Sequence, residues 1–286
     1  MSLLCDKQED FVRSVYMQPQ QAPAIILYNR YQIDDIRTLC SQECIRSLRS
    51  VLSVDHTFNM SSLFVTAMVF RNKKVVRKVS QEPSIFVGPL MLHGDGKFVT
   101  YHHFFSSVNA TLNGTTVDSK EIVCKGMVTG LDEEQALVNA AKTAFPNLKQ
   151  LYCMIHCTDN ARHYMANAGV CADTRECVGP FVCVNGVAEA GDELTMDNRI
   201  SDVMQHLRQS NVDESTITYK QDCILPKVIA NNWLKWKEVW LGQHQWTNNN
   251  SESTNHLLKI KVSDVTNFYI SNCTDNWTIV QMWMVA

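Results

Sequence analysis

Three acidic residues stand where a carboxylate could bind a metal ion. Asp55 and Asp132 each follow an apolar-rich run typical of a strand, and Glu252 lies in the polar segment 247–255. A buried, ionised carboxylate is costly unless a cation or several hydrogen-bond donors compensate its charge. Oxygen ligands suit Mg²⁺ or Mn²⁺, and three carboxylates could hold two such ions about 3.5 to 4 Å apart. The sequence therefore contains a candidate two-metal site.

Each of these carboxylates also has a simpler explanation. Asp55 could lie at an exposed strand edge and bond to Thr57 or to the backbone. Asp132, followed three residues later by Gln135, fits a helix N-cap with its capping-box partner. Glu252 falls in the first turn of an expected helix, where the backbone dipole favours negative charge. For each carboxylate alone, both interpretations remain open.

A second candidate site is a zinc site built on Cys153 and His156. Their Cys-x-x-His spacing supplies half of a zinc ligand set, and other thiols follow closely, at Cys157, Cys171, Cys177 and Cys183. The alternative is a buried thiol at Cys153 on a strand and a hydrogen-bonding imidazole at His156 beside the acidic cluster. Eleven scattered cysteines, an odd number, favour reduced thiols over a disulfide framework.

Basic and aromatic residues gather in two places. The densest basic patch is predicted to lie in a hairpin turn and consists of Arg71, Lys73, Lys74, Arg77 and Lys78. It could contact DNA phosphates, or it could be a solvated turn that prevents strand association. Four tryptophans, interleaved with lysines, stand at positions 233, 236, 240 and 246. They could stack on bases, although such a stripe is more typical of a helical core.

The composition limits the classes of function. The chain has 286 residues, of which 45% are hydrophobic, so it can bury a large core. Its net charge of −3 excludes a surface that is basic throughout, and any contact with DNA must be local. The first ten residues lack the pattern of a secretory signal, and no apolar run approaches the roughly 20 residues of a membrane helix. We therefore expect neither export nor a membrane partner.

The elements that must position these residues follow from the hydrophobic patterns. Three strands are predicted to form an antiparallel meander, at 51–58, 63–70 and 75–79. Helices and strands then alternate, with helices at 97–108 and 133–145 and strands at 121–128 and 148–156. This order predicts an α/β fold, with a mixed sheet and helices on both of its faces.

The same patterns divide the chain into four parts. Residues 1–48 are predicted to be a linker and a helical segment, and residues 49–157 the first part of the core. Residues 158–246 are predicted to be a mostly helical insertion, with helices at 198–208 and 224–240. Residues 247–286 would complete the core and supply the third acidic residue.

Several separate segments resemble the pattern of Mutator-like element (MULE) transposases, in the same order, over roughly residues 50–260. Residues 54–58 resemble the first acidic strand of that family, and residues 89–93 with Tyr101 and Phe104 resemble the next strand and helix. Residues 129–145 resemble the stretch with the second aspartate. The Cys-x-x-His motif at 153–156 and the polar segment 248–255 resemble the two remaining motifs.

The resemblance implies a ribonuclease H-like catalytic core of a DDE-type DNA transposase. Asp55, Asp132 and Glu252 would then be both catalytic residues and ligands of two Mg²⁺ or Mn²⁺ ions. Its partner would be DNA, its form a homo-oligomer and its location nuclear. Three features differ from the family. Gly130-Leu131 stands where a threonine usually precedes the aspartate, no zinc-binding DNA-recognition domain is evident before residue 50, and no clear Cys/His-rich zinc module is evident after residue 260.

Two other functions are compatible with the same residues. One is a domesticated, catalytically silent descendant that binds DNA or protein partners. The other is an interaction module stabilised by zinc at Cys153, His156 and neighbouring thiols. The complete acidic set favours the enzyme over both alternatives.

Overall fold

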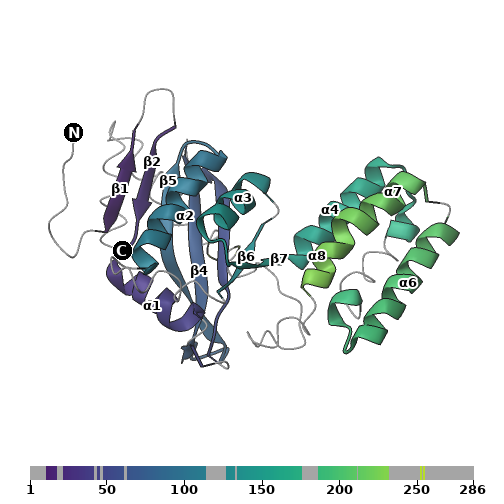
Figure 1. Ribbon diagram of the computed structural model, residues 1–286, viewed down its shortest axis with the longest axis horizontal. Coiled ribbons are helices and arrows are strands. Elements are labelled where there is room, and N and C mark those ends of the chain that lie inside the picture. The colour runs from purple at the N-terminus through teal and green to yellow at the C-terminus, as the bar shows by residue number, and fades with distance from the viewer. Residues whose placement is uncertain are drawn as a thin grey trace.

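The computed structural model of the protein contains a β-sheet with helices packed on it and a separate helical lobe (Figure 1). The lobe lies beyond the edge of the sheet formed by the last strand. The structure describes residues 11–17, 22–41, 44–45, 48–60, 63–113, 127–132, 134–175, 186–210 and 212–231, together with positions 252 and 254. The predicted α/β class with a mixed sheet is confirmed.

The sheet has seven strands in the order β1-β2-β5-β4-β3-β6-β7. The strands are β1 (Val12–Tyr16), β2 (Ala24–Leu27), β3 (Leu52–Met60), β4 (Leu63–Val76), β5 (Pro83–His93), β6 (Val128–Leu131) and β7 (Lys149–Tyr152). From β1 to β3 all neighbouring strands pair antiparallel. The strands β6 and β7 continue the sheet beyond β3 as parallel neighbours.

The meander differs from its prediction at the second strand. We expected β4 to end at residue 70 and another strand to begin at 75, but β4 continues to Val76. The third strand of the meander is instead β5. The polar residues 71–74 are typical of a turn, but in the structure they lie on a stretch of β4 that extends past β3. A strand that leaves the sheet has no buried face to demand apolar residues.

The N-terminal part contains two strands besides the predicted helical segment, which is present as a helix at Arg30–Cys40. Within residues 1–48, β1 and β2 form two additional strands of the sheet, and β2 pairs with the end of β5. Pro23 stands directly before β2, where the absence of an N–H group does not break a ladder of hydrogen bonds. Pro23 therefore borders a strand rather than interrupting one.

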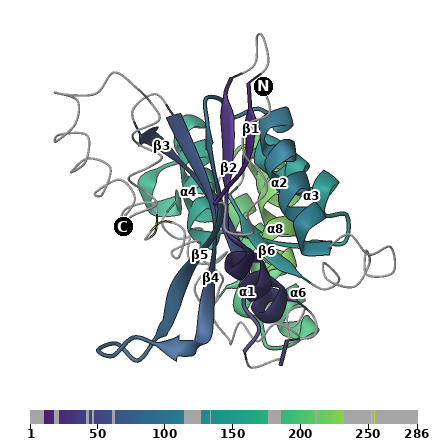
Figure 2. The ribbon, with the colours of Figure 1, turned by 90° about the vertical axis from the view of Figure 1, so that its left-hand side faces the viewer.

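Three helices cover one face of the sheet: α1 (Arg30–Cys40), α2 (Phe98–Asn113) and α3 (Gln135–Ala144) (Figure 2). A capping box between Asn29 and Gln32 begins α1. The largest buried side chains of this layer come from α2 and include Tyr101, Phe104 and Phe105. Among the described residues, the helices packed on the sheet lie on this face, so helices on the opposite face remain a prediction.

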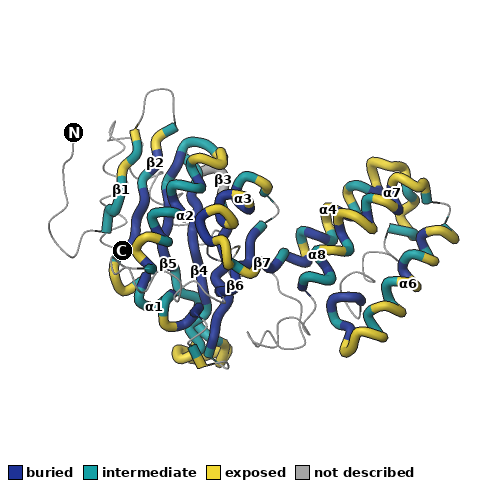
Figure 3. The backbone as a smooth tube through the Cα atoms, viewed as in Figure 1, coloured by how far each residue is buried: buried dark blue, intermediate teal, exposed yellow. Residues whose placement is uncertain are grey.

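The second lobe is helical, as predicted for the insertion. It contains α4 (Met154–Asn167), α6 (Glu193–Gln209), α7 (Glu214–Tyr219), the π-helical turn η3 (Lys220–Ile224), α8 (Leu225–Ala230) and the short 3-10 helix η2 (Val187–Glu189). Its buried residues, dark blue in Figure 3, form two apolar clusters. Because α4 begins at Met154, the lobe starts before the predicted boundary at 158. The four tryptophans lie outside the described residues.

One buried amide joins the helical lobe to the sheet. The Asn231 side chain, at the end of α8, accepts a hydrogen bond of 3.0 Å from the Tyr152 N–H and donates one to the Tyr152 carbonyl. Both groups belong to β7, the last strand of the sheet. Asn231 therefore pairs with the edge of the sheet much as another strand would.

Within the described ranges, no helix is long and apolar enough to cross a membrane.

We expect Asn231→Ala to lower the free energy of unfolding by about 1–3 kcal/mol, because it leaves two backbone groups of Tyr152 without their partner. Urea denaturation followed by circular dichroism measures the change. Asn167→Ala, at an exposed position of α4, is the matched control and should change stability little. Equal urea midpoints for the two variants would contradict the role of this amide.

Candidate metal centre

The sheet places three chemically active residues at one level. In the parallel pairs, Val54 stands opposite Leu131, and Leu131 stands opposite Tyr152. The next residue along each chain is Asp55, Asp132 and Cys153, respectively. These three residues thus lie side by side. Asp55 lies within β3, whereas Asp132 and Cys153 directly follow the carboxyl ends of β6 and β7, which is where open α/β sheets bind ligands.

The two aspartates are in direct contact. The Asp55 side chain is 5% exposed and shares a hydrogen bond with the Asp132 carboxyl group. Burial, and then the hydrogen bond and charge of Asp132, raise the pKa of Asp55 to about 9. In the absence of a cation, one proton is therefore held between the two carboxyl groups. The interpretation of Asp55 as an exposed edge residue is wrong.

Asp132 does not cap the following helix. The N-cap of α3 is Glu134, and the Gln135 amide donates to Asn139, one turn further on, rather than closing a capping box. The Asp132 carboxylate instead lies 2.9 Å from the Nδ1 atom of His156. The capping interpretation is therefore wrong, and the side chain of Asp132 is directed into the cluster.

His156 reaches the cluster because the chain changes from strand to helix earlier than predicted. We expected a strand through residue 156, but β7 ends at Tyr152, Cys153 is the N-cap, and His156 lies in the first turn of α4. Hydrogen bonds to Asp132 and Cys153 raise the pKa of His156 to about 11. Its imidazolium then balances part of the negative charge of the carboxylates.

Glu252 completes the group from a distant part of the sequence. It is helical, and its Oε1 atom lies 3.6 Å from the Nε2 atom of His156. The His156 ring therefore bridges Asp132 and Glu252. The structure thus brings all three predicted acidic residues to one place, with the Glu252 side chain 43% exposed at its open side.

Two sets of ligands overlap in this cluster. The carboxylates of Asp55, Asp132 and Glu252 form a set of hard oxygen donors that suits Mg²⁺ or Mn²⁺. Ligand atoms of Cys153, His156 and Glu252 lie within 4.8 Å of one another, which suits one Zn²⁺ ion. The buried pair of Asp55 and Asp132 favours the first set, because a divalent cation could replace the proton that they share.

The other predicted zinc thiols do not join this set. Cys157 is buried among the apolar residues of the helical lobe. Cys171 is exposed and follows the end of α4. Cys177 and Cys183 lie outside the described residues. Among the described thiols, Cys153 is therefore the one near the candidate metal centre.

A second polar layer, which the sequence did not predict, supports the acidic strands. Side chains alternate along a strand, so His56 points to the helix-covered face, opposite to Asp55. The Glu134 carboxylate lies 2.8 Å from His56 Nδ1 and accepts hydrogen bonds of 3.1 and 3.2 Å from the Tyr101 hydroxyl. A Cβ at Gly96 would lie 3.1 Å from that carboxylate, so glycine suits this close approach.

This layer couples residues next to both aspartates. His56 follows Asp55, and Glu134 is two residues beyond Asp132, so their contact ties β3 to the loop after β6. Burial, followed by the charge of Glu134, raises the pKa of Tyr101, which keeps its hydroxyl group a donor. The sequence signal was the proximity of His56 and Glu134 to the candidate ligands, but only long-range packing shows that they meet.

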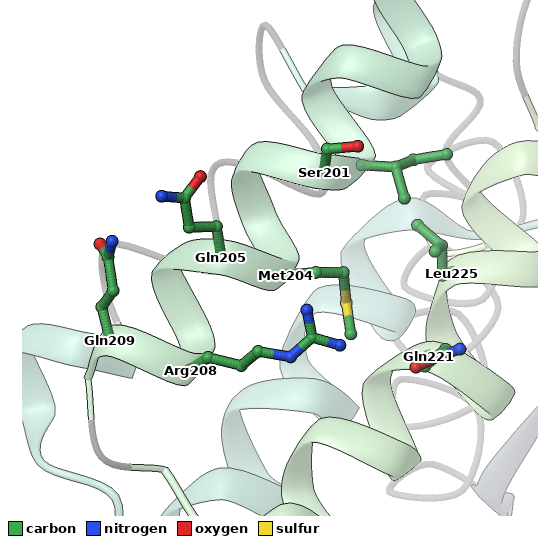
Figure 4. A pocket seen from close by; sticks show the side chains of 8 residues that line it. Ser201, Met204, Gln205, Arg208, Gln209, Gln221 and Leu225 are labelled. Atoms are coloured by element: carbon green, nitrogen blue, oxygen red, sulfur yellow. The ribbon is translucent and has the colours of Figure 1, made fainter.

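Two other features lie away from the cluster. The basic patch is on and beyond the end of β4, with Arg71, Lys73 and Lys74 on the strand and only Arg77 and Lys78 past it. A groove of about 630 Å³ lies between α6 and the η3–α8 segment of the helical lobe (Figure 4). Arg208 is its one charged lining residue, so the groove offers no carboxylate ligand for a metal ion.

Comparison of the sequence with protein-family models and with curated proteins finds no match in either case. The interpretation of the cluster therefore rests on its own geometry and on the resemblance of its motifs.

We expect the protein to bind Mn²⁺ and Asp132→Asn to weaken this binding at least about ten-fold, because the variant loses an anionic ligand of a buried site. Isothermal titration calorimetry of the purified chain measures the affinity. Asp197→Asn, at an exposed position of α6, is the control and should bind like the wild type.

The same titration separates the two ligand sets. If the carboxylates hold the ion, Cys153→Ser leaves Mn²⁺ binding intact, and Asp55→Asn abolishes it. Tight binding of Zn²⁺ that depends on Cys153 but not on Asp55 would contradict the carboxylate site and favour the zinc site.

We expect Tyr101→Phe to lower the free energy of unfolding by about 1 kcal/mol, because the partly buried Glu134 carboxylate loses its hydroxyl donor. Tyr31→Phe, at a residue that is 80% exposed, is the control for removal of a hydroxyl group. The measurement is urea denaturation without divalent ions. Identical stability of both variants would show that the second polar layer does not hold the site together.

Proposed function

We propose that this protein is the catalytic domain of a DDE-type DNA transposase, similar to the Mutator-like element family. The observation that carries the proposal is the meeting of Asp55, Asp132 and Glu252 around His156. These carboxylates come from β3, from the end of β6 and from a distant helical segment. Two-metal cleavage of phosphodiester bonds needs such a set of oxygen ligands.

The arrangement of the sheet supports a ribonuclease H-like core. An antiparallel meander of β3, β4 and β5 is followed by the parallel strands β6 and β7 on the other side of β3. Asp55 lies within β3, and Asp132 directly follows the adjacent strand β6. The sequence pattern predicted a meander followed by alternating helices and strands, hence a mixed sheet.

The residues of the cluster would divide the work of the reaction. Bound Mg²⁺ or Mn²⁺ ions would activate a water molecule or a DNA 3′-hydroxyl group and stabilise the leaving oxygen. Asp55 and Asp132 would hold the ions at the buried end of the site. His156 would orient Asp132 through the 2.9 Å contact of its Nδ1 atom. Because Glu252 is the most exposed of the three carboxylates, DNA would approach from its side.

The proposed reaction also implies the partner and the setting of the protein. The substrate would be duplex DNA, and the protein would work in the nucleus. Joining both ends of a mobile element would require at least two catalytic domains, hence a homo-oligomer.

A second candidate is a silent, domesticated descendant whose cluster has a structural role. The observation that favours it is the bridge from Asp132 through His156 to Glu252, which already compensates the carboxylates without any metal ion. In that case the fold would bind DNA or a protein partner without cutting DNA.

We expect the purified protein to nick supercoiled plasmid DNA in Mn²⁺ or Mg²⁺. The variants Asp55→Asn, Asp132→Asn and Glu252→Gln should each lower the nicking rate by roughly 10²-fold or more, because each removes a charged group that stabilises the transition state. Gel electrophoresis of the plasmid measures the rate. Asp197→Asn and Glu193→Gln, both exposed on α6, are matched controls. Full activity in the Asp55 variant would refute the assignment, and inactivity of a wild-type protein that binds Mn²⁺ and DNA would favour the silent descendant.

A further inference from the structure

The hairpin between β4 and β5 extends beyond the body of the sheet. We call residues 71–82 the β4–β5 arm. The pairing of β4 with its neighbour β3 ends where Val69 stands opposite Ser53. Residues of β4 beyond Val69 therefore run past the start of β3. Pairing with β5 nevertheless continues to Val76. The arm is therefore a two-stranded ribbon that projects from one end of the sheet (Figure 2).

The arm concentrates positive charge. It contains five of the 26 basic residues of the chain and one of its 29 acidic residues. Its formal net charge is thus +4, within a chain of net charge −3. The rest of the protein is correspondingly acidic and would repel a polyanion, so the charge distribution directs a polyanion to the arm.

The cations of the arm are accessible to a ligand. Lys74, Arg77 and Lys78 are exposed. Arg77 forms an ion pair with Glu82. Among the residues that the structure describes, Lys74 and Lys78 form no ion pair with an acidic side chain. The charge of Lys74 also acts on the Asp35 carboxylate, but without an ion pair between them, so both ammonium groups can contact phosphates.

A bulge displays part of this charge. The register places Asn72 opposite Ser84 and Val76 opposite Pro83, so the three residues 73–75 on β4 have no partner on β5. The Asn72 side chain accepts a hydrogen bond of 3.0 Å from the Lys74 N–H within this bulge. Bulges redirect side chains at the edges of sheets, and Lys74 within this one is exposed, whereas Lys73 is half-buried.

The arm also carries exposed apolar side chains. Val75, Val76 and Val79 are 43%, 51% and 96% exposed. Cations alone would bind any anion. Exposed valine methyl groups beside the cations favour a ligand whose surface carries both phosphates and apolar groups. The major groove of B-DNA admits a two-stranded ribbon, has phosphates along its walls and presents thymine methyl groups on its floor.

We propose that the β4–β5 arm binds duplex DNA, with its lysines on the phosphates and its valines directed into the major groove. The arm is separate from the acidic cluster. Ala67 pairs with Asp55, and Arg77 stands ten residues further along the same chain, about 33 Å away at the rise of an extended strand. Binding by the arm therefore requires neither a metal ion nor cleavage.

Fluorescence anisotropy with a labelled 30-base-pair duplex, in EDTA and at 50 to 200 mM KCl, tests the proposal. We expect Lys74→Gln combined with Lys78→Gln to weaken binding at least about ten-fold at the lowest salt. The slope of log affinity against log salt concentration should also become less negative by about 2. Each phosphate contact contributes roughly 0.9 to this slope, and the variant loses two contacts. The matched control is Lys142→Gln combined with Arg208→Gln, which removes two exposed cations elsewhere.

The outcomes are distinct. A reduced slope in the arm variant alone supports the proposal, and an equal effect of the two double variants overturns it, because net charge would then explain the binding. Unchanged binding in the arm variant also overturns it. A companion variant, Val76→Ser with Val79→Ser, should weaken binding without changing the salt slope. Because binding is measured without metal ions, a failure of the nicking assay would not affect this result, and unchanged Mn²⁺ binding shows that the arm variants are folded.

Discussion

The contact between the buried carboxyl groups of Asp55 and Asp132 is the interaction on which the rest of the site depends. Two desolvated acidic groups in contact cannot both be ionised without a positive partner. The fold supplies His156 in the first turn of α4, where the positive end of the helix backbone adds to the charge of its imidazolium. A divalent cation would meet the same requirement, so the same constraint links the architecture and the proposed chemistry.

The parallel pairing of β3, β6 and β7 is what makes this contact. Shifting β6 by one residue along β3 would move Asp132 away from the level of Asp55 and turn its side chain to the opposite face. The hydrogen-bonded layer of His56, Glu134 and Tyr101 opposes such a shift, because it joins the same two strands from the helix-covered face. Preorganised ligands of this kind reduce the reorganisation that binding of an ion would require.

The distribution of charge separates two tasks. Acidic groups gather where β3 passes the carboxyl end of β6, and basic groups gather on the β4–β5 arm at the far end of β4. A metal site needs concentrated negative charge, whereas a phosphate-binding surface needs the opposite, and placing both in one region would neutralise both. The length of β4, at 14 residues, keeps the two regions apart. The small net charge of −3 is thus the sum of a positively charged region and a negatively charged region that lie apart.

The sequence by itself determined the α/β class, the amphipathic helices α1 and α3, the strand around Asp55 and the position of Asp132 between a strand and a helix, because these depend on local periodicity and composition. It misplaced the end of β7, since a short apolar run such as that around Cys153 does not distinguish a strand from the start of a buried helix. It also missed β1, β2 and the polar layer around Glu134. Only the tertiary structure decided that His156 bridges Asp132 and Glu252, because strand register and the approach of distant segments arise from long-range pairing and packing, which no local pattern encodes.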